Sequence, residues 1–245
     1  MKNLELIGVE GLPEVRPGDD LGSMIAAHAQ LEPGDVLVVA QKVVSKAEGR
    51  LVRLADVIAG EEAVRLAPRL IAMPDPRVVQ VVLDESVRVL RSERVLITET
   101  RHGFVCANAG VDHSNTGGGG VLTLLPIDPD ASAHRIRDRI HVLGGTEVGV
   151  IVSDTFGRPW RLGIVNVALG VAGVPAAIDL RGTFDDEGAP LHATVLGVAD
   201  DIASSAGLVM QKTARTPAVI VRGLSLSGDG SGRDLIRPES EDLFR

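Results

Sequence analysis

The sequence predicts a mixed α/β fold of the α+β kind, built on a sheet that is partly antiparallel. Short runs of β-branched residues recur along the chain between Gly, Pro and Asp, which favours buried strands. Segments between these runs repeat their apolar residues at helical spacing. The two kinds of segment do not alternate strictly, because residues 87–107 indicate neighbouring strands joined by a tight turn at 100–103.

The expected elements can be placed in chain order. Strands are expected at 4–9, 35–40, 94–99, 148–153, 176–180 and 218–223, and helices at 20–30, 61–70, 132–143 and 195–206. In the third of these helices Ile136, Ile140 and Leu143 share one face, which favours a helix packed against a sheet. Asp130 is the candidate residue for capping its start.

The domain organisation is expected to be simple. A chain of 245 residues is long enough to bury a sizeable core, and we expect residues 1–245 to form a single unit of one or two lobes. Residues 225–245 read as a Gly/Ser-rich loop followed by a C-terminal tail.

Composition and charge argue against several classes of function. Aromatic residues make up 2% of the chain and the net charge is −8, so neither a base-stacking platform nor a basic stripe for nucleic acid is expected. The start lacks the pattern of a signal peptide, and no apolar stretch reaches the ~20 residues that a membrane span needs. The single cysteine, Cys106, lies in an apolar stretch typical of a core position and suits a reducing compartment. We therefore expect a cytoplasmic protein without a membrane or nucleic-acid partner.

The first polar cluster follows the expected strand at 35–40. The stretch AQKVVSKAEG (40–49) carries Lys42, Ser45, Lys46 and Glu48. Lysines at the end of a strand are suited to phosphate because their charge is compact. The same pattern is typical of a strand end whose lysines are simply solvated.

The second cluster is DHSNTGGGGVL (112–122), in which Asp112 and Asn115 offer oxygens three residues apart and His113 stands between them. The glycines that follow allow backbone N–H groups to approach a phosphate or carboxylate closely. A glycine tract is equally typical of a flexible spacer. The chain contains neither a Walker A string nor a Rossmann glycine fingerprint, so neither a P-loop fold nor a dinucleotide-binding fold is expected.

The third cluster is VGVIVSDTFGRPWRLG (148–163). An expected strand delivers Asp154 and Thr155 at its carboxyl end, the usual ligand position in open α/β sheets, and Arg158 and Arg161 follow after a turn. Carboxylate and hydroxyl oxygens suit Mg²⁺ or Mn²⁺, and guanidinium groups suit phosphate or carboxylate. An acid in this place can also serve only to cap a turn.

Taken together, and in this order, these segments resemble the coenzyme F420-0:gamma-glutamyl ligase family. The resemblance rests on GLPEVRPGDDL (11–21), VVSKAEGR (43–50), GVDHSNT (110–116), VIVSDTFGRPWRLG (150–163) and IVRGL (220–224), and it covers essentially the whole chain. It implies a two-lobed mixed α/β fold peculiar to the family and a homodimer. It further implies an enzyme that uses GTP and two divalent ions, Mg²⁺ or Mn²⁺, with K⁺ as a further candidate ion. The implied reaction joins L-glutamate to the lactyl carboxylate of the deazaflavin coenzyme F420-0, with further γ-linked glutamates as a later product.

The resemblance also assigns roles to particular residues. It implies that the catalytic residues are Lys46, Asp112 and Asp154, that GTP contacts Gly11, Leu12, Pro13, Glu14, Gln41, Lys46, Asn115 and Gln211, and that metal binds Asp112, Asp154, Thr155 and Gln211.

The implied chemistry agrees with these residue types. A carboxylate reacts with an amine only after its oxygen has become a leaving group, and transfer of the γ-phosphoryl group of GTP would provide an acyl phosphate. Lys46 would add a fixed positive charge, and Arg158 and Arg161 are candidates for holding the anionic groups of the acceptor. From the residues alone, a metal-dependent phosphohydrolase and a non-catalytic GTP-binding protein remain alternatives.

Overall fold

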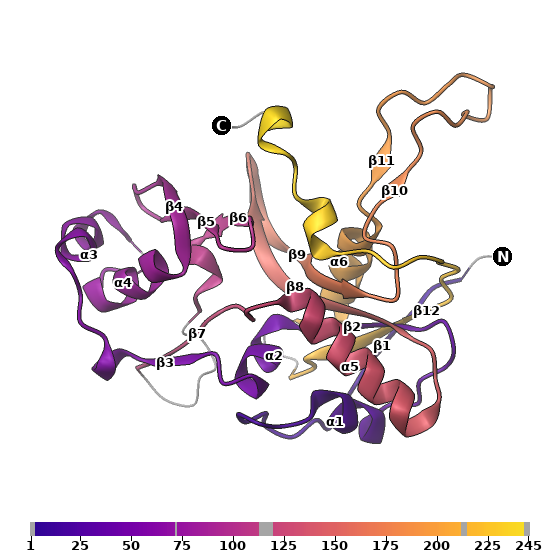
Figure 1. The fold of residues 1–245 in the computed structure, drawn as a ribbon, viewed down its shortest axis with the longest axis horizontal. Helices are drawn as coiled ribbons and strands as arrows, with labels where there is room; N and C mark the ends of the chain where they lie inside the picture. The colour runs from indigo at the N-terminus through magenta and orange to yellow at the C-terminus, as the bar shows by residue number, and fades with distance from the viewer. Residues whose placement is uncertain (1–2, 72, 113–119, 212–214, 243–245) are drawn as a thin grey trace.

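A five-stranded mixed sheet forms the centre of the computed structural model, which describes residues 3–71, 73–112, 120–211 and 215–242 (Figure 1). The strand order is β1 (Glu5–Gly8), β12 (Ala218–Arg222), β2 (Val36–Ala40), β8 (Gly149–Arg158) and β9 (Arg161–Ala172). Only β2 and β8 run parallel, and the other neighbouring pairs are antiparallel. The expected mixed α/β class with a partly antiparallel sheet is confirmed.

Helices cover both faces of this sheet because successive residues of its strands point to opposite sides. Leu37 and Val39 of β2 pack with α1 (Leu21–His28), α2 (Gln41–Ala47) and α5 (Pro129–Gly144). Val36 and Val38 pack with α6 (Val198–Met210) on the other face. The central strands are therefore buried on both sides, as their unbroken apolar runs require.

A second group of elements lies beside the sheet, on the left in Figure 1. It contains β3 (Leu51–Arg53) paired with β7 (Val121–Thr123), α3 (Glu61–Leu66), α4 (Pro76–Asp84), and the small sheet of β4 (Ser86–Arg91), β5 (Ile97–Thr100) and β6 (Val105–Ala107). Five 3-10 helices, at Leu54–Asp56, Ala67–Arg69, Asn108–Gly110, Gly232–Leu235 and Glu239–Glu241, complete the described elements. We call residues 51–124 the side unit; it has its own apolar cluster, in which Val79 and Leu122 are fully buried.

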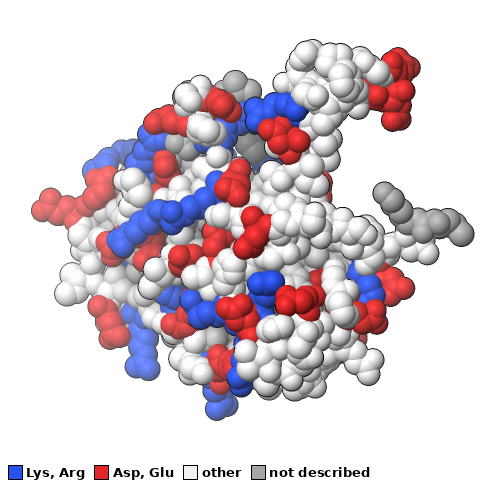
Figure 2. Space-filling model, turned by 45° about the vertical axis from the view of Figure 1, so that its right-hand side comes forward, with Lys and Arg blue, Asp and Glu red and all other residues white. Residues whose placement is uncertain are grey.

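Two features extend away from the body of the molecule (Figure 1). The hairpin of β8 and β9 continues past the other strands to a tip at which Trp160 and Leu162 are exposed. A narrow arm, residues 178–196, begins and ends with the two-stranded pair β10 (Ile178–Asp179) and β11 (Val195–Leu196). Figure 2 shows basic and acidic side chains interspersed over one face of the body, while acidic side chains gather at the end of the arm.

Most of the expected elements are present, with shifted ends. The helix expected at 132–143 begins at Pro129, and Asp130 as its cap was wrong: Asp128 caps it by accepting from Ala131 N at 3.0 Å. Pro129 at the first helical position places the cap one residue before it. The expectations did not include α2, α4 or β9. Among the helices of the described residues, none is long and apolar enough to cross a membrane.

Candidate functional site

The candidate site lies at the carboxyl ends of the two parallel strands, β2 and β8. Ala40, the last residue of β2, pairs with Ser153 of β8, so Gln41 and Asp154 both follow at the same edge of the sheet. This edge is where open α/β sheets usually bind ligands. Two of the three polar clusters in the sequence therefore meet here, since α2 begins directly at Gln41.

The remaining cluster, the second in the sequence, has its first residue, Asp112, held at this edge by an ion pair. Lys42, in the first turn of α2, donates to Asp112, with Nζ and Oδ2 2.6 Å apart. The backbone of Asp112 is fixed by two hydrogen bonds with Thr123, the last residue of β7. The side chains of Lys42 and Asp112 keep 21% and 36% of their surface exposed, so both can be reached by a ligand. Asn115 and His113 lie outside the described residues.

The last turn of α2 presents Lys46 to the loop that precedes α1. Lys46 Nζ lies 2.5 Å from Glu14 Oε1, and the lysine side chain is only 12% exposed while that of Glu14 is 74% exposed. The same loop is tied to α2 by a hydrogen bond from Gly18 N to Ala47 O. Gly11 has a φ of +75°, which favours glycine at this turn. The structure thus brings the expected segment Gly11-Leu12-Pro13-Glu14 next to Lys46.

The side chain of Gln41 makes its contacts within the protein. Its side chain is buried, and its amide nitrogen donates to Ser45 Oγ at 2.6 Å and to Leu124 O at 2.9 Å. Both hydrogens of this amide group are therefore used within the protein. Gln41 therefore fastens the start of α2 to the segment after β7.

Asp154 and Thr155 occupy the part of β8 that extends beyond β2. Neighbouring residues of a strand project to opposite faces, so these two side chains cannot point at one ion together. The side chain of Asp154 lies on the side of β8 that faces Cys106 in β6. Burial raises the pKa of the Cys106 thiol to about 12, and the negative charge of Asp154 raises it further. Cys106 is consequently a protonated core residue, as its sequence context predicted.

Thr155 pairs across the sheet with Asn166 of β9. The Asn166 amide nitrogen donates to Ser153 Oγ at 3.1 Å and contacts Met210 Sδ at 3.4 Å. Met210 ends α6, and Gln211 follows it with an exposed side chain and a φ of +31°. The end of α6 is thereby held beside the Thr155 side of β8.

The oxygen donors at this edge fit a hard divalent ion. Within the described part of the chain, no three His, Cys, Asp or Glu side chains gather closely enough to hold a metal by themselves. Mg²⁺ typically binds one or two carboxylates together with substrate phosphates and water. Asp112 and Asp154 supply carboxylates of that kind, so the donor set fits an ion that arrives with a nucleotide.

The hairpin beyond Thr155 carries the two arginines. One guanidinium nitrogen of Arg158 donates to Leu162 O at 2.9 Å, whereas its Nε is buried and meets no hydrogen-bond partner among the described residues. A buried N–H of this kind is costly unless something binds it. Arg161 pairs with Arg158 across the hairpin and is exposed.

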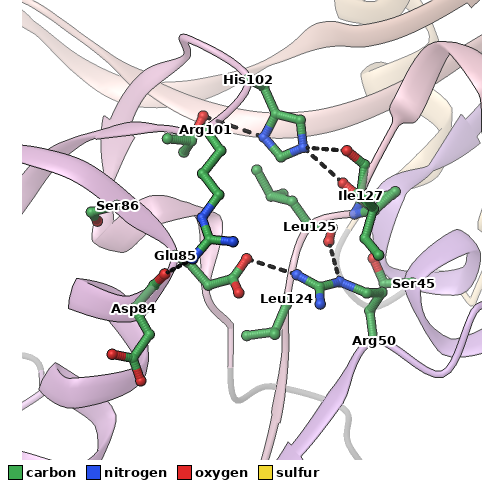
Figure 3. A network of polar contacts seen from close by, with 12 residues as sticks. Ser45, Arg50, Asp84, Glu85, Ser86, Arg101, His102, Leu124, Leu125 and Ile127 are labelled. Atoms are coloured by element: carbon green, nitrogen blue, oxygen red, sulfur yellow. Dashed lines mark hydrogen bonds and ion pairs between the residues drawn. The ribbon is translucent and has the colours of Figure 1, made fainter.

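A network that the sequence did not reveal joins the side unit to α2 (Figure 3). Arg50, just after α2, forms an ion pair of 2.7 Å with Glu85 at the end of α4, and its Nε donates to Leu125 O at 2.9 Å. Leu124 N donates to Arg50 O, and Leu124 O accepts from Gln41. These contacts link α4 to the first residue of α2, and their partners lie far apart in the sequence, so no local pattern indicates them.

A second branch of the network holds the β5–β6 turn (Figure 3). The ring nitrogen Nε2 of His102 lies 2.9 Å from Pro126 O and 3.1 Å from Ile127 O, and Arg101 donates to Asp84 O at 2.8 Å. His102 also stacks on Phe104, which meets the edge of Phe156 in β8. The turn is therefore fixed to the end of α4, to the segment after β7 and to the strand that carries Asp154.

Comparisons with known proteins identify the family of this chain. The model of the family described as F420-0:Gamma-glutamyl ligase matches residues 11–223. Proteins named coenzyme F420:L-glutamate ligase are similar over the full chain: one from Methanopyrus kandleri is 47% identical, with 100% of each chain covered. The relative from Methanocaldococcus jannaschii is 44% identical, and the match covers 100% of this chain and 98% of the relative. The relative from Archaeoglobus fulgidus is 46% identical, and the match covers 99% of this chain and 96% of the relative. The chain therefore belongs to the F420-0:gamma-glutamyl ligase family.

Proposed function

We propose that this protein is a GTP-dependent ligase that joins L-glutamate to the lactyl carboxylate of the deazaflavin coenzyme F420-0. The observation that carries the proposal is the meeting of Lys42, Asp112 and the Asp154 end of β8 at one edge of the sheet. Two lysines of α2, each paired with a carboxylate, and the loop preceding α1 provide charges that suit a nucleoside triphosphate and its metal ions. The names of the relatives support the choice of glutamate and the deazaflavin as substrates.

The proposed reaction proceeds in two transfers. An oxygen of the lactyl carboxylate attacks the γ-phosphorus of GTP, the bond to the β–γ bridging oxygen breaks, and GDP leaves. The uncharged amine of glutamate then attacks the carbonyl carbon of the acyl phosphate, and inorganic phosphate leaves with the former carboxylate oxygen. The amine loses a proton in this step, and the product is an amide. A second round on the γ-carboxylate of the added glutamate would extend the chain.

Several residues have distinct proposed roles in the first transfer. Asp112 and Asp154 would hold one Mg²⁺ or Mn²⁺ ion together with the phosphates. Thr155 and Gln211 would bind a second divalent ion on the other side of β8. K⁺ is a further candidate ion. When bound, the divalent ions would offset the charge that develops on the transferred phosphoryl group. Lys46 and Lys42 would exchange their carboxylate partners for phosphate oxygens.

The remaining parts of the proposal concern the acceptor, the assembly and the compartment. The buried, unpartnered Nε of Arg158 supports a role in holding an anionic group of the deazaflavin. The exposed side chains of Trp160 and Leu162 at the hairpin, with Phe184 on the arm, support a homodimer in which these projections are covered. The single free cysteine supports the cytoplasm as the compartment.

Mass spectrometry of the deazaflavin tests the proposed reaction. The purified protein is incubated with GTP, Mn²⁺, L-glutamate and coenzyme F420-0, and each component is omitted in turn. We expect glutamate-sized mass increments only in the complete mixture, with loss of the product in Asp154→Asn and retention in Asp201→Asn, which changes an exposed acid on α6. Near wild-type product formation by Asp154→Asn would refute the assignment of Asp154. Absence of increments in the complete mixture, with GTP consumed, would favour a phosphohydrolase instead.

A further inference from the structure

The pairing of β8 with β9 is interrupted immediately before the metal-binding residues. Val152 pairs with Gly170, but Ser153 pairs with Ala168, so Leu169 is an extra residue on β9. This arrangement is a β-bulge, which bends a strand and re-aims the side chains beside it. Asp154 and Thr155 are the next residues of β8, so the bulge sets the register of the part that carries them.

Two aspartates bind the backbone amides on either side of the extra residue. Asp200 Oδ1 accepts from Ala168 N at 2.8 Å, and Asp130 Oδ1 accepts from Val171 N at 2.8 Å. Asp200 belongs to the first turn of α6 and Asp130 to the first turn of α5, and these helices cover opposite faces of the sheet. The bulge is therefore held from both faces by side chains of the same kind.

The C-terminal tail completes this clamp. Asp130 also accepts from Gly232 N at 2.8 Å and from Ser231 Oγ at 2.6 Å. The backbone of Gly232 lies so close to the carbonyl of Leu169 that a Cβ there would collide with it. A Cβ on Gly170 would likewise collide with the backbone of Pro129. These close approaches leave the bulge no room to move along β9.

The carboxylate of Asp200 is held at an energetic cost. Burial raises its pKa, the Ala168 amide offsets this only in part, and the neighbouring charge of Asp201 adds to the rise. When such a buried carboxylate is charged, the folded state is less stable than it would be with the same carboxylate exposed to water. The hydrogen bond to Ala168 N therefore serves the local geometry of the bulge at some cost in stability.

We infer that Asp200 and Asp130 are positioning residues, which fix the bulge at Leu169 and thereby keep Asp154 on one face of β8 and Thr155 on the other in the register that the proposed site requires. A slip of one residue would turn the side chains of β9 beyond the bulge to the opposite face. Asn166, which pairs with Thr155 and bonds Ser153, would then leave the α6 side of the sheet. This inference rests on the proposed function, because it assumes that Asp154 and Thr155 bind the metal and nucleotide.

The test compares Asp200→Ala with Asp200→Asn, which keeps an oxygen acceptor, and with the matched control Asp201→Ala in the same helical turn. Mn²⁺ binding in the presence of GTP is measured by electron paramagnetic resonance, and backbone hydrogen exchange is measured over residues 153–155 and 166–169. We expect at least tenfold weaker Mn²⁺ binding and faster exchange in Asp200→Ala, substantial recovery of both in Asp200→Asn, and wild-type values in Asp201→Ala.

A folded Asp200→Ala protein with the Mn²⁺ affinity and exchange rates of Asp201→Ala would overturn the inference. Should Asp200→Ala fail to fold, Asp200→Glu keeps the charge but displaces the acceptor by one methylene, and unchanged Mn²⁺ affinity in that variant would equally overturn it. Failure of the wild-type protein to bind Mn²⁺ with GTP is a separate result: it would refute the proposed function, while the exchange data would still report whether Asp200 holds the bulge.

Discussion

Lys42 and Asp112 are 70 positions apart in the sequence, yet the ammonium nitrogen of one lies 2.6 Å from a carboxylate oxygen of the other. The pair joins α2 to the segment of the side unit that pairs with β7, at the sheet edge where Asp154 follows Ser153 in β8. In this arrangement Lys42 neutralises a carboxylate that we propose as a metal ligand. Arrival of a metal ion and a triphosphate would give each of the two residues a more highly charged partner.

Replacing Lys42 should weaken nucleotide binding. A charge-assisted hydrogen bond to phosphate contributes about 1.5–3 kcal/mol, so Lys42→Met is expected to raise the KM for GTP about tenfold or more. Lys42→Arg keeps the charge and should recover part of the loss. Steady-state kinetics at varied GTP concentration measure both variants. A Lys42→Met enzyme with an unchanged KM and kcat would show that the lysine serves only its ion pair with Asp112.

The two hairpin arginines should differ in their importance for the acceptor. Arg158 has a buried Nε that meets no partner among the described residues, whereas Arg161 is exposed. We expect Arg158→Lys to raise the KM for coenzyme F420-0 about tenfold, the loss of one charge-assisted contact, and Arg161→Lys to change it far less. Kinetics at saturating GTP and glutamate decide this. Equal effects of the two substitutions would contradict the preference for Arg158.

The stability of the fold should depend on pH through Asp35. Burial alone would raise the pKa of Asp35, but the Arg222 guanidinium and the backbone amide of Glu32 lower it below its ordinary value. A carboxyl whose pKa is lower in the folded state adds stability above its unfolded pKa of about 3.9, and this stability is lost as pH falls through the folded pKa. Asp35→Asn should therefore cost about 2 kcal/mol at pH 7, the range of a hydrogen bond to a charged group.

Urea denaturation of the wild type and Asp35→Asn at pH 7 and at pH 3 provides the measurement. The difference in the free energy of unfolding between the two proteins should shrink at the lower pH. Asp186→Asn, which changes an exposed acid on the arm, is the control. A difference that stays constant between the two pH values would mean that the ionised carboxylate of Asp35 is not the source of the stability.

The exposed apolar tip of the β8–β9 hairpin should matter for assembly. Trp160 is 84% exposed and Leu162 is 99% exposed. If these side chains are covered in a homodimer, Trp160→Ser combined with Leu162→Ser should shift the protein toward the monomer in sedimentation velocity. Val142→Ser, at another exposed apolar position, should not. A wild-type protein that is monomeric at micromolar concentration would rule out the proposed dimer.

Local sequence patterns predicted the elements that depend mainly on neighbouring residues. The apolar runs at 35–40 and 148–153 correspond to β2 and β8, and the polar residues after them lie at the candidate site. The helix α2 was missed because Val43 and Val44 lie only three and four residues after the valine-rich strand β2, so the segment resembles its continuation. The cap of α5 was misplaced by two residues although Pro129 carried the signal for Asp128.

The parts that could not be predicted depend on contacts between distant segments. The ion pair between Arg50 and Glu85 and the hydrogen bond from Gln41 to Leu124 join residues that only the tertiary fold brings together. The bulge at Leu169 depends on two helix starts that bind β9 from opposite faces, and its only local sign is Gly170 inside an apolar strand. The residues of the candidate site were grouped in the sequence by the family resemblance, but the contact that brings Lys42 to Asp112 required the structure.

The most direct test of the proposed activity is the ratio of GDP formed to glutamate incorporated. GDP is measured by chromatography and glutamylated deazaflavin by mass spectrometry, in the same reactions and with acceptor and glutamate each omitted. An acyl-phosphate route predicts one GDP per glutamate added, with little GDP when the acceptor is absent. Steady release of GDP and phosphate that is independent of coenzyme F420-0 would contradict the account.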